Sequence, residues 1–174
     1  MKALIFILLS FVTVNLVAQN NSLKIGWVDS QIILQQYAPA IKAQSDLDAL
    51  TQKWSKKIDS MTKELQQAYQ TAQKQLANMT PDKQKEVQQN LVMKEQQIQD
   101  FRQKKFGQPN GEFFAKQTEL MQPIKDKIMK AIDVVRKKEG MNYIFDKAGG
   151  VVVLYADPEF DLTNAVLDKL KRGK

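Results

Sequence analysis

The stretch from Ile41 to Asn78 contains no glycine and no proline, and its apolar residues recur at intervals of three and four. The mean interval is about 3.6 residues, the period of an α-helix with one apolar face. At 1.5 Å per residue this helix is roughly 57 Å long, too long for the rest of the chain to cover. We therefore expect it to project into solvent. Its apolar residues are Leu47, Leu50, Trp54, Ile58, Met61, Leu65, Ala68, Ala72, Leu76 and Met79.

A turn and a return helix follow. Thr80 can cap a helix, Pro81 suits the first helical position, and Asp82 suits the positive helix end. The apolar face of the return leg is sparser, and the charged Lys94 occupies a position where the period predicts an apolar residue. We predict an antiparallel coiled-coil arm over residues 41–118 with a thin seam. The apolar residues of the return leg are Val87, Leu91, Ile98 and Phe101.

The return leg is interrupted at residues 107–111, which read GQPNG. Gly107 can end one helix, Pro109 cannot continue it, and Asn110 can cap the next. One interpretation is a hinge at Gly107, Pro109 and Gly111 that lets the outer arm swing. The other is a rigid bulge that absorbs a difference in length between the two legs. The aromatic residues available to pack such a bulge are Trp54, Phe106, Phe113 and Phe114.

The two ends of the chain, residues 19–40 and 119–174, are predicted to form one small body. Residues 25–28 alternate as in a short strand, while residues 141–146 and 151–156 are predicted to pair as a hairpin. The expected fold class is mainly α, with a long helical hairpin that projects from a compact α+β body. The residues expected to form the body or to assemble several copies of it are Ile25, Trp27, Val28, Ile144, Val152 and Leu154.

Residues 1–18 are predicted to be a cleaved signal peptide, with Lys2, an apolar run and a small residue, Ala18, at the cleavage site. The run is shorter than a membrane span requires. The chain has no cysteine, so neither a lipid-modified cysteine nor a disulfide is expected. Its net charge of +7 favours acidic partners or anionic membrane surfaces. Nucleic acid is not expected, because an exported protein rarely meets it.

The residue types present leave little room for catalysis. The absence of histidine and cysteine excludes histidine acid/base chemistry, thiol nucleophiles and the common zinc sites. Asp157, Glu159 and Asp161 alternate like calcium ligands, but the segment lacks the glycine and glutamate that an EF-hand loop requires. A turn followed by a helix cap explains them, although an enzyme would have to use these carboxylates. We expect no enzymatic activity and no cofactor.

Three segments taken in order carry a family resemblance: KIGWVDSQIILQQY, the Gln/Lys-rich hairpin, and MQPIKDKIMKAIDVVRKKEGMNYIFD with the residues after it. Together they resemble the Skp/OmpH family of periplasmic chaperones. The resemblance implies a homotrimer whose arms surround a cavity, in which unfolded outer-membrane β-barrel proteins are held without ATP. The alternative is an exported structural or tethering coiled coil with a fixed partner. A lipopolysaccharide site proposed for the family is not transferred, because the arm is interrupted there.

Two sets of arm residues are candidates for binding. Apolar side chains off the seam would touch an unfolded client, and methionine adapts well to varied partners; seam packing or incidental exposure is the alternative for each. Basic side chains near the break would contact anionic lipid headgroups or remain solvated. The client-binding candidates are Tyr69, Met79, Val92, Met93 and Phe106, and the basic cluster is Arg102, Lys104 and Lys105.

Overall fold

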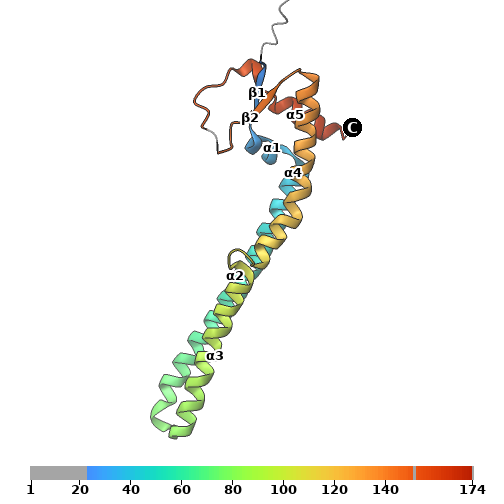
Figure 1. Cartoon of the computed structure of the whole chain (residues 1–174). Helices are drawn as coiled ribbons and strands as arrows, with labels where there is room; N and C mark the ends of the chain where they lie inside the picture. Colours follow the sequence, from blue (N-terminus) through green and yellow to red (C-terminus); the bar gives the residue numbers. More distant parts are fainter. Residues whose placement is uncertain (1–22, 151, 174) are drawn as a thin grey trace, which may run out of the picture.

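The computed structural model describes residues 23–150 and 152–173. The predicted signal peptide, residues 1–18, lies outside the described residues. Figure 1 shows a small body of strands and short helices, from which a long two-legged helical arm extends. The predicted fold class, mainly α with a small β body and a projecting antiparallel hairpin, is confirmed.

The outgoing leg is one continuous helix, α2 (Ala38–Gln75), extended by the 3-10 turn η1 (Leu76–Asn78). Pro39 lies in its first turn, where proline is favoured because the first amides of a helix have no partner within it. The predicted apolar positions of this leg are buried or half-buried except Leu76, whose side chain is 50% exposed. Leu76 is the first residue of η1, whose 3-10 winding departs from the α-helical period of the seam.

The return leg begins with α3 (Pro81–Phe106), which packs antiparallel to α2. The side chain of Thr80 caps it by accepting from the N–H of Lys83, as predicted. Leu91 and Ile98 are buried against α2, and Lys94 is half-buried at the position where an apolar residue is missing. The seam therefore has the predicted position and the predicted weakness.

The return leg stops at Phe106 and resumes as α4 (Glu112–Lys138), which runs back into the body. Gly107 is the C-cap of α3. The N-cap of α4 is Gly111, without a side-chain hydrogen bond, so the prediction that Asn110 caps this helix is wrong. The carbonyl of Gly111 itself accepts the first α4 hydrogen bond, from Phe114 at 3.0 Å.

The body contains β1 (Ile25–Val28), α1 (Ser30–Gln36), β2 (Tyr143–Asp146), the 3-10 turn η2 (Pro158–Phe160) and α5 (Thr163–Arg172). The strands pair in parallel, with Ile25 opposite Tyr143 and Val28 opposite Asp146.

The predicted hairpin between residues 141–146 and 151–156 is therefore wrong. β2 pairs with β1, and the N–H of Lys147 extends this pairing by donating to the carbonyl of Val28 at 2.8 Å. Val151 lies outside the described residues, and residues 152–156 form no strand. Within the described part of the chain, no strand lies beside Val152 and Leu154, so this apolar segment has no strand partner.

The core of the body joins all of its helices to β1. Ile33 of α1, Ile128 of α4 and Val166 of α5 are buried together, and the last turns of α4 supply Val135. None of the helices in the described ranges is long and apolar enough to cross a membrane. The cluster consists of Val28, Ile33, Tyr37, Ala40, Ala43, Ile124, Ile128, Ala131, Val135, Met141, Leu162, Val166 and Leu167.

Candidate functional site

The outer arm presents apolar side chains to solvent on α3. Val92 and Met93 are each 56% exposed, and they lie off the seam that Leu91 and Ile98 form against α2. Both were expected there from the helical period. They give the arm accessible apolar surface without removing a side chain from its packing.

Tyr69 lies on α2, and its ring is partly exposed. Its hydroxyl donates to the carboxylate of Glu95 on α3 at 2.6 Å, and this hydrogen bond raises the pKa of Tyr69. The residue therefore links the two legs as well as offering one face of its ring to solvent. The sequence period places Tyr69 off the seam but cannot show this link.

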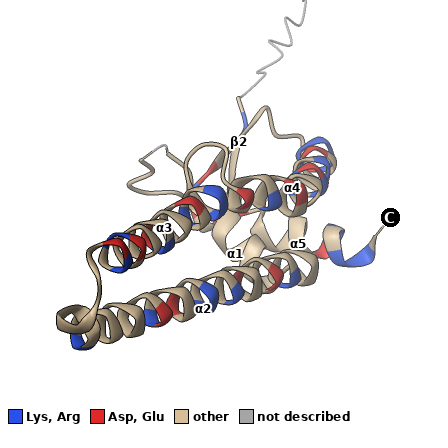
Figure 2. Ribbon diagram, turned by 90° about the horizontal axis from the view of Figure 1, so that it is seen from below, with Lys and Arg blue, Asp and Glu red and all other residues tan. Residues whose placement is uncertain are grey.

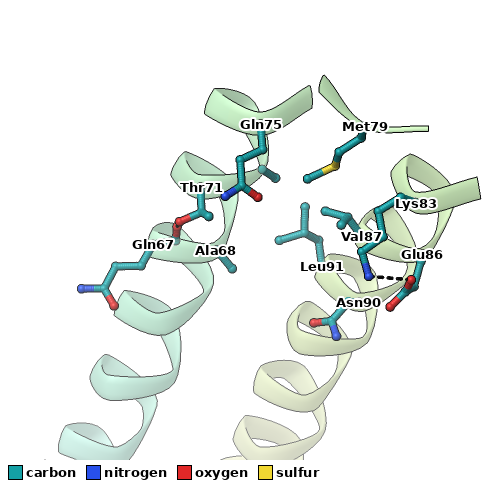
Figure 3. A pocket seen from close by; sticks show the side chains of 11 residues that line it. Gln67, Ala68, Thr71, Gln75, Met79, Lys83, Glu86, Val87, Asn90 and Leu91 are labelled. Carbon is teal, nitrogen blue, oxygen red and sulfur yellow. Dashed lines mark hydrogen bonds and ion pairs between the residues drawn. The ribbon is translucent and has the colours of Figure 1, made fainter. Parts of the chain in front are cut away.

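Met79 lies at the tip, where the two legs diverge and leave a groove of about 390 Å³. Figure 3 shows its side chain pointing between the legs, opposite Val87 and Leu91. Ala68 of α2 is small, so the groove remains open there. The apolar floor is bordered by the amides of Gln67, Gln75 and Asn90 and by the Lys83–Glu86 ion pair.

Phe106, the last client-binding candidate, is half-buried beside the break. Its ring lies edge-on to Trp54 of α2, with 5.5 Å between centroids, and 6.5 Å from Phe113 of α4. Phe113 in turn contacts Phe114 at 5.4 Å. Phe106 is thus engaged in packing, and less of it faces solvent than of Val92 or Met93.

The basic cluster is divided by the structure. Arg102 and Lys104 are exposed on α3, whereas the side chain of Lys105 is 16% exposed and pairs with Glu112. Figure 2 shows basic and acidic residues intermixed along the legs of the arm. The three residues therefore do not form one basic patch.

The glycines of the break permit close backbone approaches. The N–H of Gly111 donates to the carbonyl of Gly107 at 2.6 Å, and a Cβ on Gly111 would lie 2.7 Å from that oxygen. A Cβ on Gly107 would lie 2.5 Å from the carbonyl oxygen of Gln103. Alanine at either position would therefore displace the backbone, so these substitutions cannot test a hinge cleanly.

Helix α2 passes the break without interruption, because Trp54 lies in the interior of Ala38–Gln75. A swing of the whole outer arm about Gly107, Pro109 and Gly111 would also have to bend α2. The aromatic contacts of Trp54 and Phe106 favour the rigid-bulge interpretation for the conformation seen here.

The body exposes large apolar side chains at two places, on the loop after β2 and on its strands. Val152, Leu154 and Tyr155 are 82%, 94% and 82% exposed, and Ile25 of β1 is also exposed. Of the other predicted body residues, Val28 is in the core, Ile144 packs against it, and Trp27 is half-buried, with its indole N–H donating to the carbonyl of Asp157 at 2.9 Å.

Tyr143 and Phe145 of β2 are exposed as well. Tyr143, Phe145 and Tyr155 were not among the predicted body residues, although the alternation of residues 143–146 indicates a strand with one exposed face. On the strands and on the loop after β2, the exposed large apolar residues are Ile25, Tyr143, Phe145, Val152, Leu154 and Tyr155.

The candidate catalytic carboxylates and the aspartates at the strand ends are helix caps and turn acceptors. Asp157 accepts from the N–H of Glu159 and Asp161 from the N–H of Thr163, at 3.0 and 2.9 Å. Asp29 caps α1 through Ile32, and Asp146 accepts from Ser30 at 3.0 Å. Within residues 23–150 and 152–173, no group of three acidic side chains is placed to hold a metal ion.

Comparison with known proteins agrees with this architecture. Six chains of solved structures match, among them an OmpH-like protein of Caulobacter crescentus CB15 that has been proposed to be an outer membrane chaperone. The two chains superpose with a TM-score of 0.72 at 14% sequence identity, covering 87% of this chain and 86% of the other. No curated protein matches the sequence. The family model for outer membrane proteins of the OmpH-like type matches residues 24–170. Because this match spans most of the chain, the protein belongs to the OmpH-like family.

Proposed function

We propose that the protein is an ATP-independent holdase chaperone, which binds unfolded outer-membrane β-barrel proteins between its arms and prevents their aggregation. The observation that carries the proposal is the exposed apolar surface of Val92 and Met93 on a long arm, which no other described part of the chain covers. A structural coiled coil would be expected to use such side chains in its seam. Membership of the OmpH-like family and the proposed chaperone role of the Caulobacter protein support this function.

Several copies of the chain would assemble through the exposed apolar residues of the strands and of the loop after β2, and the family resemblance favours a homotrimer. Val152, Leu154 and Tyr155 bring strand-forming side chains to a segment without a strand partner in the described part of one chain. Pairing with another copy would satisfy this backbone and bury the apolar side chains. Three arms would then surround a common cavity.

Client retention would depend on many weak contacts. Burial of apolar surface contributes only about 25 cal/mol per Å², so a few side chains such as Val92, Met93 and the Met79 groove hold a segment loosely. Many such weak contacts, added over several arms, would retain a long unfolded chain. Each single contact would form and break rapidly. Release would then require neither catalysis nor a nucleotide, in keeping with a sequence that has no phosphate-binding loop.

The proposed location is the periplasm, reached after cleavage of residues 1–18. The excess of basic residues, to which Arg102 and Lys104 contribute, would favour contact with anionic lipid at the membrane surface. No contact with nucleic acid is proposed.

The test uses the signal-free protein, its native mass, and the light scattering of an unfolded outer-membrane β-barrel diluted into it from urea. A trimer that keeps the barrel soluble in a defined complex is the expected result. The double substitution Val92→Ser/Met93→Ser should weaken this protection, whereas the matched exposed pair Gln88→Ser/Gln89→Ser should not. A protein that leaves the barrel to aggregate would favour the structural coiled coil instead.

A further inference from the structure

Lys105 connects three helices at the break. Its ammonium lies 5.0 Å from the ring centroid of Trp54 on α2 and 5.7 Å from that of Phe101 on α3. It also donates a hydrogen bond to the carboxylate of Glu112, the first residue of α4. The aromatic rings exclude water from a charge that is otherwise seldom buried. One side chain thus joins both sides of the break to the uninterrupted leg.

The contacts around Lys105 close the break onto α2. Phe106 packs edge-on to Trp54, and the Gly111 N–H bonded to the Gly107 carbonyl draws the two helix ends together. The carboxylate of Glu112 is 41% exposed, so dissolved ions can reach the ion pair from the outside. The rest of the cluster is apolar and responds little to salt.

Beyond this point, α3 is attached to α2 by a thin seam, by the hydrogen bond from the hydroxyl of Tyr69 to Glu95, and by the turn at the tip. Its seam buries Leu91 and Ile98, and the half-buried Lys94 interrupts the apolar row between them. A seam with so few apolar contacts specifies register weakly. The position of α3 along α2 therefore depends largely on the tip turn, the Tyr69–Glu95 hydrogen bond and the cluster at Lys105.

We propose that Lys105, Trp54 and Glu112 form a clasp that holds α3 in register on α2, and that salt weakens this clasp so that α3 separates from α2 while the body stays folded. Helix α3 is then a separate opening unit, because its burial is local and its link to α4 is the break with this one cluster, whereas α2 runs on uninterrupted. The inference rests on the fold of a single chain and is independent of the proposed chaperone function.

The test is amide hydrogen exchange of the signal-free protein, followed by mass spectrometry at low and at high sodium chloride. In Glu112→Gln at low salt, amides of α3 should exchange about three to ten times faster than in the unmodified protein, and the response to salt should shrink. Amides of α5 in the body should be unchanged. Lys105→Met keeps an apolar stem over Trp54 but removes the charge, and should behave in the same way.

The matched control is Glu119→Gln, which breaks the exposed Lys116–Glu119 ion pair within α4. It should leave the exchange of α3 and its salt response as they are. Because the chain has no cysteine, spin labels at Gln66→Cys and Gln97→Cys can report the separation of the legs, which should broaden in Glu112→Gln.

Two results would overturn the clasp. The first is that the amides of α3 exchange as fast in Glu112→Gln and in Lys105→Met as in the unmodified protein, with the same response to salt. The ion pair would then not hold the leg. Equal acceleration of α3 and α5 would show that arm and body open together, so that no separate unit exists.

Discussion

The body and the outer arm both consist largely of α-helices, but the body buries many more apolar side chains than the outer arm does. In the body, residues of α1, α2, α4, α5 and β1 form one cluster in which Ile33 and Val166 are completely covered. Beyond Trp54, the described residues of the outer arm that are buried are Ala72, Leu91 and Ile98. Most of the favourable burial is therefore concentrated in the body.

The difference shows how one short chain can combine a fixed platform with an adaptable extension. Helices packed along a single thin seam are held largely by their own hydrogen bonds and by pairs one turn apart, such as Lys83–Glu86. Such a region opens at a lower free energy than a region with a closed core. We expect the arm to fluctuate while the body keeps its shape.

The largest expected effect is on the body. Ile33→Ala should lower the free energy of unfolding by about 3 kcal/mol, because it leaves a cavity at a fully buried position. Urea unfolding at a fixed protein concentration, followed by circular dichroism, measures the change. The matched arm variant Leu91→Ala should instead speed amide exchange in α3 with little change in the unfolding midpoint. If both variants lowered the urea concentration at the unfolding midpoint equally, body and arm would unfold as one unit.

The next effect concerns the junction of the two regions. Gly111→Ala should destabilise the break by about 2 kcal/mol, because its Cβ would lie 2.7 Å from the carbonyl oxygen of Gly107 and the backbone would have to move. Exchange of the amides on either side of the break measures this. Gly150→Ala is the control, since a Cβ there meets nothing within 4 Å. Equal tolerance of both alanines would show that the close approach is unimportant.

A third substitution should reduce the difference in stability between the body and the outer arm, because it strengthens the arm. Lys94→Leu fills the gap in the seam with apolar surface and should slow the exchange of α3, equivalent to about 1 kcal/mol of added stability. Lys85→Leu, at an exposed position of the same helix, should have no such effect. A similar gain from both would indicate a general rise in helix propensity rather than seam packing.

The smallest effect is the response to acid. Hydrogen bonds from Lys105 lower the pKa of Glu112 below its ordinary 4.5, and those from Lys137 and Arg136 lower the pKa of Asp133 below 3.8. A lowered pKa in the folded state means stabilisation that is present above the ordinary value and is lost as the pH falls through the folded value. Glu112→Gln should remove this acid response from the arm and Asp133→Asn from the body. Fluorescence of Trp54, in a Trp27→Phe background, follows the arm. An unchanged acid response of Trp54 in Glu112→Gln would contradict the assignment.

The helical arm could be predicted from sequence because its information is local. The period of the apolar residues, the cap at Thr80 and the helix start at Pro81 each depend on residues nearby in the sequence. The seam and the turn were therefore predicted correctly. The hairpin prediction failed for the opposite reason. Residues 143–146 pair with residues 25–28, and this pairing over a long stretch of chain excludes the nearer partner at 152–156.

In the candidate site, too, features set by nearby residues could be predicted, and contacts between the two legs could not. Helical period alone placed Val92 and Met93 off the seam and on the surface. It could not show that the hydroxyl of Tyr69 bonds to Glu95, or that Phe106 packs on Trp54, because these partners come from the other leg.

The sequence by itself determined the general layout of this protein. It predicted a projecting antiparallel arm, a thin seam, a break in one leg and a body made from both ends of the chain. Tertiary structure alone decided the parallel pairing of β1 with β2 and the course of α2 past the break. It also decided the removal of Lys105 from its basic neighbours into a cluster with Trp54 and Glu112. The physical reason is that helix period and capping depend on neighbours in sequence, whereas strand pairing and the environment of a charge depend on neighbours in space.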